Sequence, residues 1–274
     1  MSLKSRALKM MTIAVLAMGV LLPASAVNAD ILDSLEGYWQ FEQADPYADS
    51  SVNNNDLEAV ASTTGPTFGP GQVGDAVILS GAPGGWEYLR TIDPITSAVT
   101  GSNPRTMNTW FRADADQFSV PVSYGTTAVV GQLFEVLLLD SGHAFGGVYG
   151  GHFWGGNNDT YVAPPANPVY GIGEWNMATV VYGGGTTMDF YVNGQLLKTS
   201  TVYSIDTTTV VGDDDLEAFL VGATNWPVAG WRPPTFTGAV DDVALWSRTL
   251  DAGEVQAVFN AGVNGGDLYS ISEA

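Results

Sequence analysis

Near the end of the chain, residues 236–262 read FTGAVDDVALWSRTLDAGEVQAVFNAG. The first half of this stretch is an apolar, strand-like run that carries two adjacent carboxylates, Asp241 and Asp242. Because successive residues of a strand point to opposite faces, we expect Val240 and Asp242 on one face and Asp241 with Val243 on the other. The stretch therefore predicts a closing strand that keeps an acidic pair among its core residues.

A short helix is predicted to follow this strand. Asp251 is suited to cap its start, and Glu254, three positions later, completes the pattern of a capping box. Three apolar residues recur at helical spacing and form one stripe, Val255, Val258 and Phe259. Gly262 is placed to end the helix in a left-handed turn. The chain is thus expected to finish with one strand and one short C-terminal helix.

Strand-like segments recur throughout the rest of the chain. They combine apolar residues with turn signals between them, over residues 38–42, 75–80, 86–90, 106–113, 132–140, 143–150, 174–182 and 216–223. Asn193-Gly194 interrupts residues 188–200 and is the strongest short-range signal for a hairpin. No linker or repeat divides the chain. The pattern predicts one all-β domain over residues 30–274, a two-sheet antiparallel sandwich or jelly roll.

The first 29 residues predict an export signal and not a part of the domain. Lys4, Arg6 and Lys9 give a basic start, the run MMTIAVLAMGVLLP supplies an apolar segment, and small residues follow before Asp30. The apolar run is shorter than the about 20 residues that a membrane-spanning helix needs. We therefore expect a signal peptide over residues 1–29 and a secreted protein with no membrane span, located outside the cell, at its surface or in the periplasm.

The charge of the chain restricts its partners. The formal net charge is −20, from 9 basic and 29 acidic residues. Three of the basic residues lie in the signal segment, which leaves six in the mature chain and a charge of −23. Such a surface repels phosphate backbones and anionic polymers, which disfavours nucleic acid and leaves neutral glycans or divalent cations. Solubility in a salty medium is the simpler explanation of this charge. With no cysteine in the chain, disulfides and thiolate chemistry are excluded.

Four segments in series resemble the laminin-G-like, concanavalin A-like jelly-roll domains of secreted bacterial proteins, a group of lectins and glucanases. They are GYWQFEQADPYADSSVNNNDLEA (37–59), GPGQVGDAVILSG (69–81), EWNMATVVYGGGTTMDFYVNGQLL (174–197) and the closing stretch quoted above. The resemblance implies two curved antiparallel sheets packed face to face, with the first and last strands as neighbours. Residues 114–173 are less typical of the family.

The resemblance also implies a calcium ion near the two ends of the domain. Calcium prefers several oxygen ligands, at least one of them anionic. The early loop 45–56 is rich in Asp and Asn, and pairing of the first and last strands would bring Asp241 to it. Asp49 and Asp241 are accordingly the expected calcium ligands. The alternative is that Asp241 accepts hydrogen bonds from the backbone amides of this loop with no metal.

No acidic pair on a single strand predicts catalysis. Glycoside hydrolases on this fold need two carboxylates that face one cleft, which on one strand means positions i and i+2 or i+4. Glu135 and Asp140 are five apart and are expected on opposite faces. Carboxylates from separate strands are not excluded by this argument. His143 and His152 would need a carboxylate to bind zinc, and ordinary turn or surface positions explain them better.

A candidate ligand site lies in HFWGGNNDTY, residues 152–161. An aromatic ring can stack on the apolar face of a sugar while neighbouring polar side chains bond to its hydroxyls. The stretch offers this combination in Trp154, Asn157, Asn158, Asp159 and Tyr161. The alternative is a loop in which the tryptophan folds back over the edge of the sandwich.

These observations predict a secreted, non-catalytic carbohydrate-binding or adhesion module, a lectin in the broad sense, stabilised by calcium. Two alternatives stay open at this point. One is a glycoside hydrolase or polysaccharide lyase on the same fold, and the other is a structural surface or matrix protein that binds no sugar. Because one fold hosts many functions, the site has to decide between them.

Overall fold

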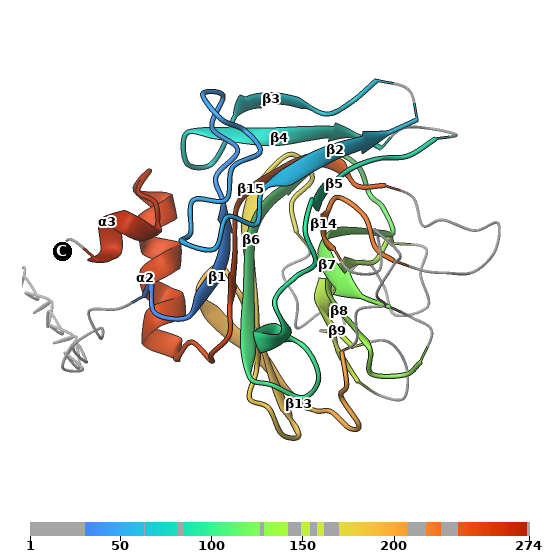
Figure 1. Cartoon of the computed structure of the whole chain (residues 1–274), viewed down its shortest axis with the longest axis vertical. Helices are drawn as coiled ribbons and strands as arrows, with labels where there is room; N and C mark the ends of the chain where they lie inside the picture. Colours follow the sequence, from blue (N-terminus) through green and yellow to red (C-terminus); the bar gives the residue numbers. More distant parts are fainter. Residues whose placement is uncertain are drawn as a thin grey trace, which may run out of the picture.

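The computed structural model describes residues 31–272 except for 63, 82–84, 127–128, 142–148, 154–157, 162–169, 208–217 and 226–234. Two antiparallel β-sheets pack face to face in this part of the chain, and two helices lie on the outside of one of them (Figure 1). The expected jelly-roll sandwich is confirmed. The predicted signal peptide, residues 1–29, lies outside the described residues. Among those described, no helix is both long and apolar enough to cross a membrane.

The first sheet, sheet A, has the strand order β13-β12-β11-β6-β15-β4-β3, and β1 also pairs with β15. Its strands are β1 Leu35–Trp39, β3 Thr67–Pro70, β4 Asp75–Ser80, β6 Arg105–Ala113, β11 Trp175–Tyr182, β12 Thr187–Val192, β13 Gln195–Thr201 and β15 Thr237–Trp246. The predicted hairpin is β12–β13. Its turn residues Asn193 and Gly194 have φ of +49° and +78°, the left-handed backbone that a tight two-residue turn requires.

The second sheet, sheet B, has the strand order β10-β9-β8-β7-β14-β5-β2. Its strands are β2 Leu57–Ala61, β5 Glu87–Thr91, β7 Ser119–Gly125, β8 Leu133–Leu138, β9 Tyr149–His152, β10 Asp159–Tyr161 and β14 Phe219–Val221. A short 3₁₀ helix, Ser97–Val99, precedes β6. Strands β2, β3, β7 and β10 were not among the segments expected from the sequence.

One large apolar cluster fills the space between the sheets and supplies most of the burial that stabilises the fold. Trp39 from β1 stacks on Phe219 from β14 with 4.7 Å between ring centroids, which joins sheet A to sheet B. The closing strand β15 contributes Val240, Val243 and Leu245 to the same cluster.

Strand β15 forms the centre of sheet A and brings the two ends of the domain together. Trp39 of β1 pairs with Val243 of β15, which confirms that the first and last strands are neighbours. Strand β4 pairs with the first half of β15, along the same edge of β15 that β1 uses further on. The last residue pair between β4 and β15 is Val77 with Val240. Residues 241–242 therefore lie at the gap where β15 changes partner from β4 to β1.

Helices α2 (Ala252–Val263) and α3 (Leu268–Ser272) cover the outer face of sheet A (Figure 1). The predicted capping box is present, since Asp251 accepts from the Glu254 amide at 2.9 Å and Glu254 accepts from the Asp251 amide at 2.7 Å. Helix α3 was not predicted. The predicted end of α2 is also wrong, because the left-handed residue is Gly265 and not Gly262.

Gly262 has a packing role instead. A Cβ at this position would lie 2.7 Å from Nε1 of Trp110, so only glycine lets α2 approach the sheet this closely.

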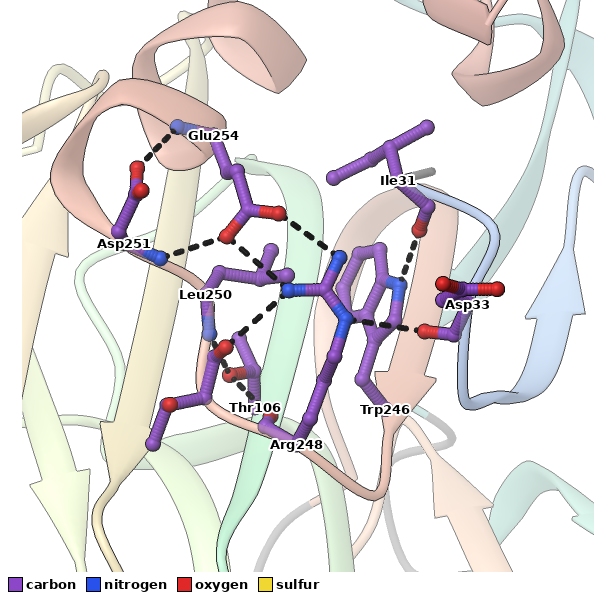
Figure 2. A network of polar contacts seen from close by, with 9 residues as sticks. Ile31, Asp33, Thr106, Trp246, Arg248, Leu250, Asp251 and Glu254 are labelled. Carbon is purple, nitrogen blue, oxygen red and sulfur yellow. Dashed lines mark hydrogen bonds and ion pairs between the residues drawn. The ribbon is translucent and has the colours of Figure 1, made fainter. Parts of the chain in front are cut away.

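Arg248 ties the start of α2 to the beginning of the domain, as Figure 2 shows. Its guanidinium lies 2.8 Å from the Glu254 carboxylate and donates from Nε to the Asp33 carbonyl at 3.0 Å. Beside it, Trp246 donates from Nε1 to the Ile31 carbonyl at 2.7 Å. The two ends of the described chain are thus held together by side chains of the closing stretch.

Candidate functional site

The acidic pair Asp241 and Asp242 sits in a β-bulge of the closing strand. Against β6, Asp241 pairs with Trp110 and Ala244 pairs with Asn108, so β15 has one residue more than its partner. Asp242 has φ of +44°, which lies in the left-handed region. The bulge changes the alternation predicted from the sequence, because Val240 and Val243 both reach the core between the sheets.

Asp241 closes the turn that leads into β4. Its Oδ2 accepts from the backbone amides of Gln72 at 2.8 Å and Val73 at 2.9 Å, and its Oδ1 accepts from the amide of Asp242 at 2.8 Å. A Cβ at Gly71 would lie 2.4 Å from Oδ2, so this glycine makes room for the carboxylate. These hydrogen bonds of Asp241 go to the turn before β4 and to the next residue of β15, and not to the 45–56 loop that we expected it to reach.

Asp242 lies on the helix-covered side of sheet A. Its Oδ1 accepts from the hydroxyl of Tyr38 at 2.5 Å, and that hydroxyl accepts from the amide of Leu268 in α3 at 3.3 Å. A small cavity beside Asp242 is lined by Asn108 and Asp267, among others. The carboxylate therefore links β15, β1 and the last helix.

Burial governs the ionisation of this pair. Burial and the neighbouring charge of Asp242 raise the pKa of Asp241 to about 9, although the three amide bonds act in the other direction. Burial raises the pKa of Asp242 to about 7 against the opposing effect of the Tyr38 hydroxyl, and the charges of Asp267 and Glu42 raise it further. The pair therefore retains a proton over most of the neutral range.

Asp49 organises the early polar loop. Its Oδ1 accepts from the amides of Tyr38 and Ser51, and its Oδ2 accepts from the hydroxyl of Ser51 and the amide of Asn55, each at 2.8 Å. A carboxylate has about four lone-pair sites, and four donors occupy them here. Asp49 therefore shapes the loop and fixes it to β1.

These two carboxylates do not fit a shared calcium ion as they are arranged. Asp49 has no lone pair left for a metal, and Asp241 already accepts three hydrogen bonds. Among the described residues, no three His, Asp or Glu side chains gather as a metal site requires. Calcium at Asp49 and Asp241 stays a prediction from the sequence, and binding there would require the loop amides to be released.

The outer face of sheet B differs from that of sheet A, because a row of residues that crosses it is polar at every position except Leu220. Strand pairing aligns one residue from each of the seven strands, in the order Glu58, Arg90, Leu220, Ser123, Glu135, His152 and Asp159. We call this set the polar row. Phe134 and Val136, on either side of Glu135 in β8, belong to the core, so Glu135 lies on the face away from sheet A.

In the middle of the polar row, the polar side chains are buried. Ser123 donates to the Ala223 carbonyl at 2.8 Å, and Glu135 accepts from the Thr224 hydroxyl at 2.5 Å. Both Ser123 and Glu135 are fully buried. The sequence singled out Glu135 but not the row, because the register depends on strands that are far apart in the chain.

The predicted ligand stretch lies at the edge of sheet B. His152 ends β9, and Asp159 and Tyr161 bound β10, the edge strand that pairs with it. Trp154 and Asn157 lie outside the described residues, so their roles stay predictions.

Asn158 has a different role from the one predicted. It is 1% exposed, and its side-chain amide donates to the carbonyl of Tyr203 at 2.9 Å and accepts from the amide of Tyr203 at 2.7 Å. Both ends of the Asn158 amide are used inside the protein, so they are not free for a ligand. The sequence could not show this bond, which joins residues 45 positions apart.

Comparison with known proteins gives the class of the chain. A family model described as the concanavalin A-like lectin/glucanases superfamily, the Laminin_G_3 group, matches residues 84–256. The chain belongs to this family. No curated protein matches the sequence.

Several solved structures share the fold. Domain 4 of AbnA, an extracellular arabinanase of Geobacillus stearothermophilus solved with arabinotriose, is 18% identical with a TM-score of 0.59, over 81% of this chain and 97% of that domain. The binding domain of Paraclostridial Mosquitocidal Protein 1 is 15% identical with a TM-score of 0.58, over 84% of this chain and 52% of the other. The binding domain of Botulinum neurotoxin DC, solved with rat synaptotagmin II, is 13% identical with a TM-score of 0.57, over 85% of this chain and 52% of the other. This chain thus matches about half the length of the two toxin domains, and identities this low concern the fold alone.

Proposed function

We propose that this chain is a secreted, non-catalytic binding module for a neutral glycan, and that the ligand binds on the side of sheet B formed by β8, β9 and β10. The observation that carries this proposal is the difference between the two outer faces of the sandwich. Helices α2 and α3 cover the face of sheet A, whereas a polar row crosses the face of sheet B.

The charge of the protein supports a neutral ligand. With a net charge of −20, the surface repels uronic acids, sulfated glycans and nucleic acids. The arabinanase domain with this fold was solved with arabinotriose, which is a neutral oligosaccharide. The toxin domains with the same fold are binding domains as well, and one was solved with a protein partner. One of these structures thus holds a neutral oligosaccharide and two are named as binding domains, which supports a binding role for this chain.

Calcium is not part of the proposal. The hydrogen bonds of Asp49 and Asp241 hold the early loop and the turn before β4, and calcium at these residues stays a prediction from the sequence.

Binding of immobilised neutral polysaccharides by the mature protein tests the proposed function. We expect retention on at least one of debranched arabinan, xylan and laminarin, and none on polygalacturonate, which is anionic. Trp154→Ala is the companion variant, since the sequence places this tryptophan in the ligand stretch, and it should weaken retention. Absence of binding to all the neutral polymers, together with self-association of the protein, would instead favour a structural surface or matrix protein.

A glycoside hydrolase is the second candidate, and one observation favours it. In the polar row, Glu135 and Asp159 lie on β8 and β10, with β9 between them. Two strand spacings place the two backbones about 9.5 Å apart. Inverting hydrolases separate their two carboxyl groups by roughly 6.5–9.5 Å. Release of reducing ends from the same neutral polymers, lost in Glu135→Gln, would replace the binding role by this one.

A further inference from the structure

Tyr203 is an exposed aromatic residue in a firmly anchored loop after β13. Its side chain is 56% exposed, whereas Val202 and Ile205 on either side are buried in the core between the sheets. The loop is therefore fixed at two points and presents the ring between them.

Two further features hold the backbone of this loop. Asn158 binds both the amide and the carbonyl of Tyr203 with one buried side chain. Ser204, the next residue, has φ of +54°, a conformation that is uncommon for residues other than glycine. A buried amide and a strained residue are both unfavourable unless the surrounding contacts compensate them. The loop is thus held in one conformation by the Asn158 side chain and by its two buried flanking residues.

The neighbouring loop adds two aliphatic side chains. Gly131 accepts from the amide of Asp206 at 3.0 Å, and a Cβ at Gly131 would lie 2.4 Å from the carbonyl oxygen of Ser204, so the two loops touch through their backbones. Val129 and Val130 precede this glycine and are 56% and 46% exposed. We call Tyr203, Val129 and Val130 the Tyr203 platform.

The platform lies at the end of sheet B where the predicted ligand stretch begins. The carbonyl of Asn158 accepts from the amide of Phe153 at 3.0 Å, which closes β9 onto β10. The loop of Val129 leads into β8. The platform is therefore built around the same three strands, β8, β9 and β10, to which the proposed function assigns the ligand.

We infer that the Tyr203 platform is the surface on which a sugar ring of a neutral glycan stacks, with Asn158 as its positioning residue; this inference rests on the proposed function. A tyrosine combines an apolar ring face with a polar hydroxyl, which suits the apolar face and the hydroxyl rim of a sugar. Single exposed apolar residues are ordinary on protein surfaces. Tyr203 differs because its backbone is locked, and a preorganised aromatic side chain loses little entropy on binding.

Affinity electrophoresis in gels that contain debranched arabinan, xylan or laminarin tests the inference. Tyr203→Ala should weaken binding about tenfold, the equivalent of about 1.4 kcal/mol. Tyr203→Phe should stay within about twofold, because the ring is kept. Trp86→Ala is the matched control, since Trp86 is a 41% exposed aromatic residue next to β5, at the other side of sheet B. The Trp86→Ala variant should bind the polymers as tightly as the wild type.

Titration calorimetry of Asn158→Ala tests the positioning role. This variant keeps the ring but frees the backbone of Tyr203. We expect binding several-fold weaker, with the loss in the entropy of binding, at a temperature where both proteins are folded. A merely structural residue would change the unfolding midpoint and leave the affinity as it was.

The possible failures are distinguishable. A wild-type protein that binds none of the three polymers overturns the proposed function and the inference together. A wild-type protein that binds, with Tyr203→Ala binding equally well, overturns the inference alone. A dimer that Tyr203→Ala dissociates, seen by sedimentation, would also overturn it, because a second copy of the chain would then be the occupant of the platform.

Discussion

The helix-covered face of sheet A and the β8–β10 end of sheet B use polar residues in opposite ways. On sheet A, the carboxylates of Asp241 and Asp242 are buried and accept hydrogen bonds from other parts of the chain. On sheet B, the buried amide of Asn158 holds a loop whose aromatic ring remains exposed. The first arrangement joins elements to one another, and the second presents a side chain to solvent.

This difference shows why a polar cluster in the sequence is a poor guide to a binding site. The acidic pair in the closing strand drew attention as a metal site, yet the gap between β4 and β1 explains its presence. Asp241 accepts from the backbone amides of the turn before β4, and Asp242 accepts from the hydroxyl of Tyr38. The residue that we propose for binding is a tyrosine in a short segment that carries no motif.

Replacing Asp241 with alanine should produce the largest effect and would show that sheet A depends on its acidic pair. The change leaves the amides of Gln72, Val73 and Asp242 without their acceptor. Because unsatisfied buried amides are unfavourable, we expect a loss of about 3 kcal/mol in the free energy of unfolding. Urea unfolding followed by tryptophan fluorescence measures it.

The control for this variant is Asp114→Ala. Asp114 forms a surface ion pair with Arg112 at 2.9 Å, and exposed pairs contribute only about 0–1 kcal/mol. Equal losses in the two variants would show that the bonds of Asp241 are not special.

The pH dependence of stability gives the next largest effect. Burial raises the pKa of Asp241 to about 9 and that of Asp242 to about 7, both above the value of about 3.9 in an unfolded chain. Between the unfolded and folded pKa values, the folded state binds more protons than the unfolded state. The contribution of this pair to the free energy of unfolding is therefore fully present below pH 4 and is lost as the pH rises through 7 and 9. We expect the free energy of unfolding to decrease steadily between pH 6 and pH 9. Urea midpoints across this range should show it, and they should vary less in Asp241→Asn; a stability that rises with pH would contradict the assignment.

Calcium should have the smallest effect. Because Asp49 already accepts four hydrogen bonds, a calcium ion would gain few ligands there and would displace existing bonds. We expect calcium at about 5 mM, roughly the affinity of weak extracellular sites, to shift the unfolding midpoint by less than about 1 °C relative to a chelator. A rise of several degrees would restore the metal site predicted from the sequence. Asp49→Asn in the same titration would then identify the ligand.

Local signals predicted much of the fold. The capping box and the Asn193-Gly194 turn are in the structure as expected, and so is the pairing of β1 with β15, which the family resemblance implied. The bulge at Asp241 was not predictable, because alternation along one strand contains no information on where a neighbouring strand ends. The role of Gly262 depends on Trp110, and no local pattern relates the two residues.

The candidate site was less predictable than the fold, because it depends on contacts between distant segments. The stretch 152–161 was found from its composition, but its residue Asn158 binds the backbone of Tyr203, and the polar row emerges only from the register of seven strands. A weak signal for Tyr203 exists in TVYSID, where two apolar residues, now seen to be buried, flank an aromatic one.

Glycan affinity and unfolding free energy, measured in parallel in Tyr203→Ala and Asp241→Ala, would show whether binding and stability depend on different faces of the sandwich. At a temperature where both variants are folded, our account predicts that Tyr203→Ala binds the neutral polymer about tenfold more weakly with unchanged stability, whereas Asp241→Ala loses about 3 kcal/mol of stability with unchanged affinity. The reverse pattern, with binding dependent on Asp241 and indifferent to Tyr203, would contradict it.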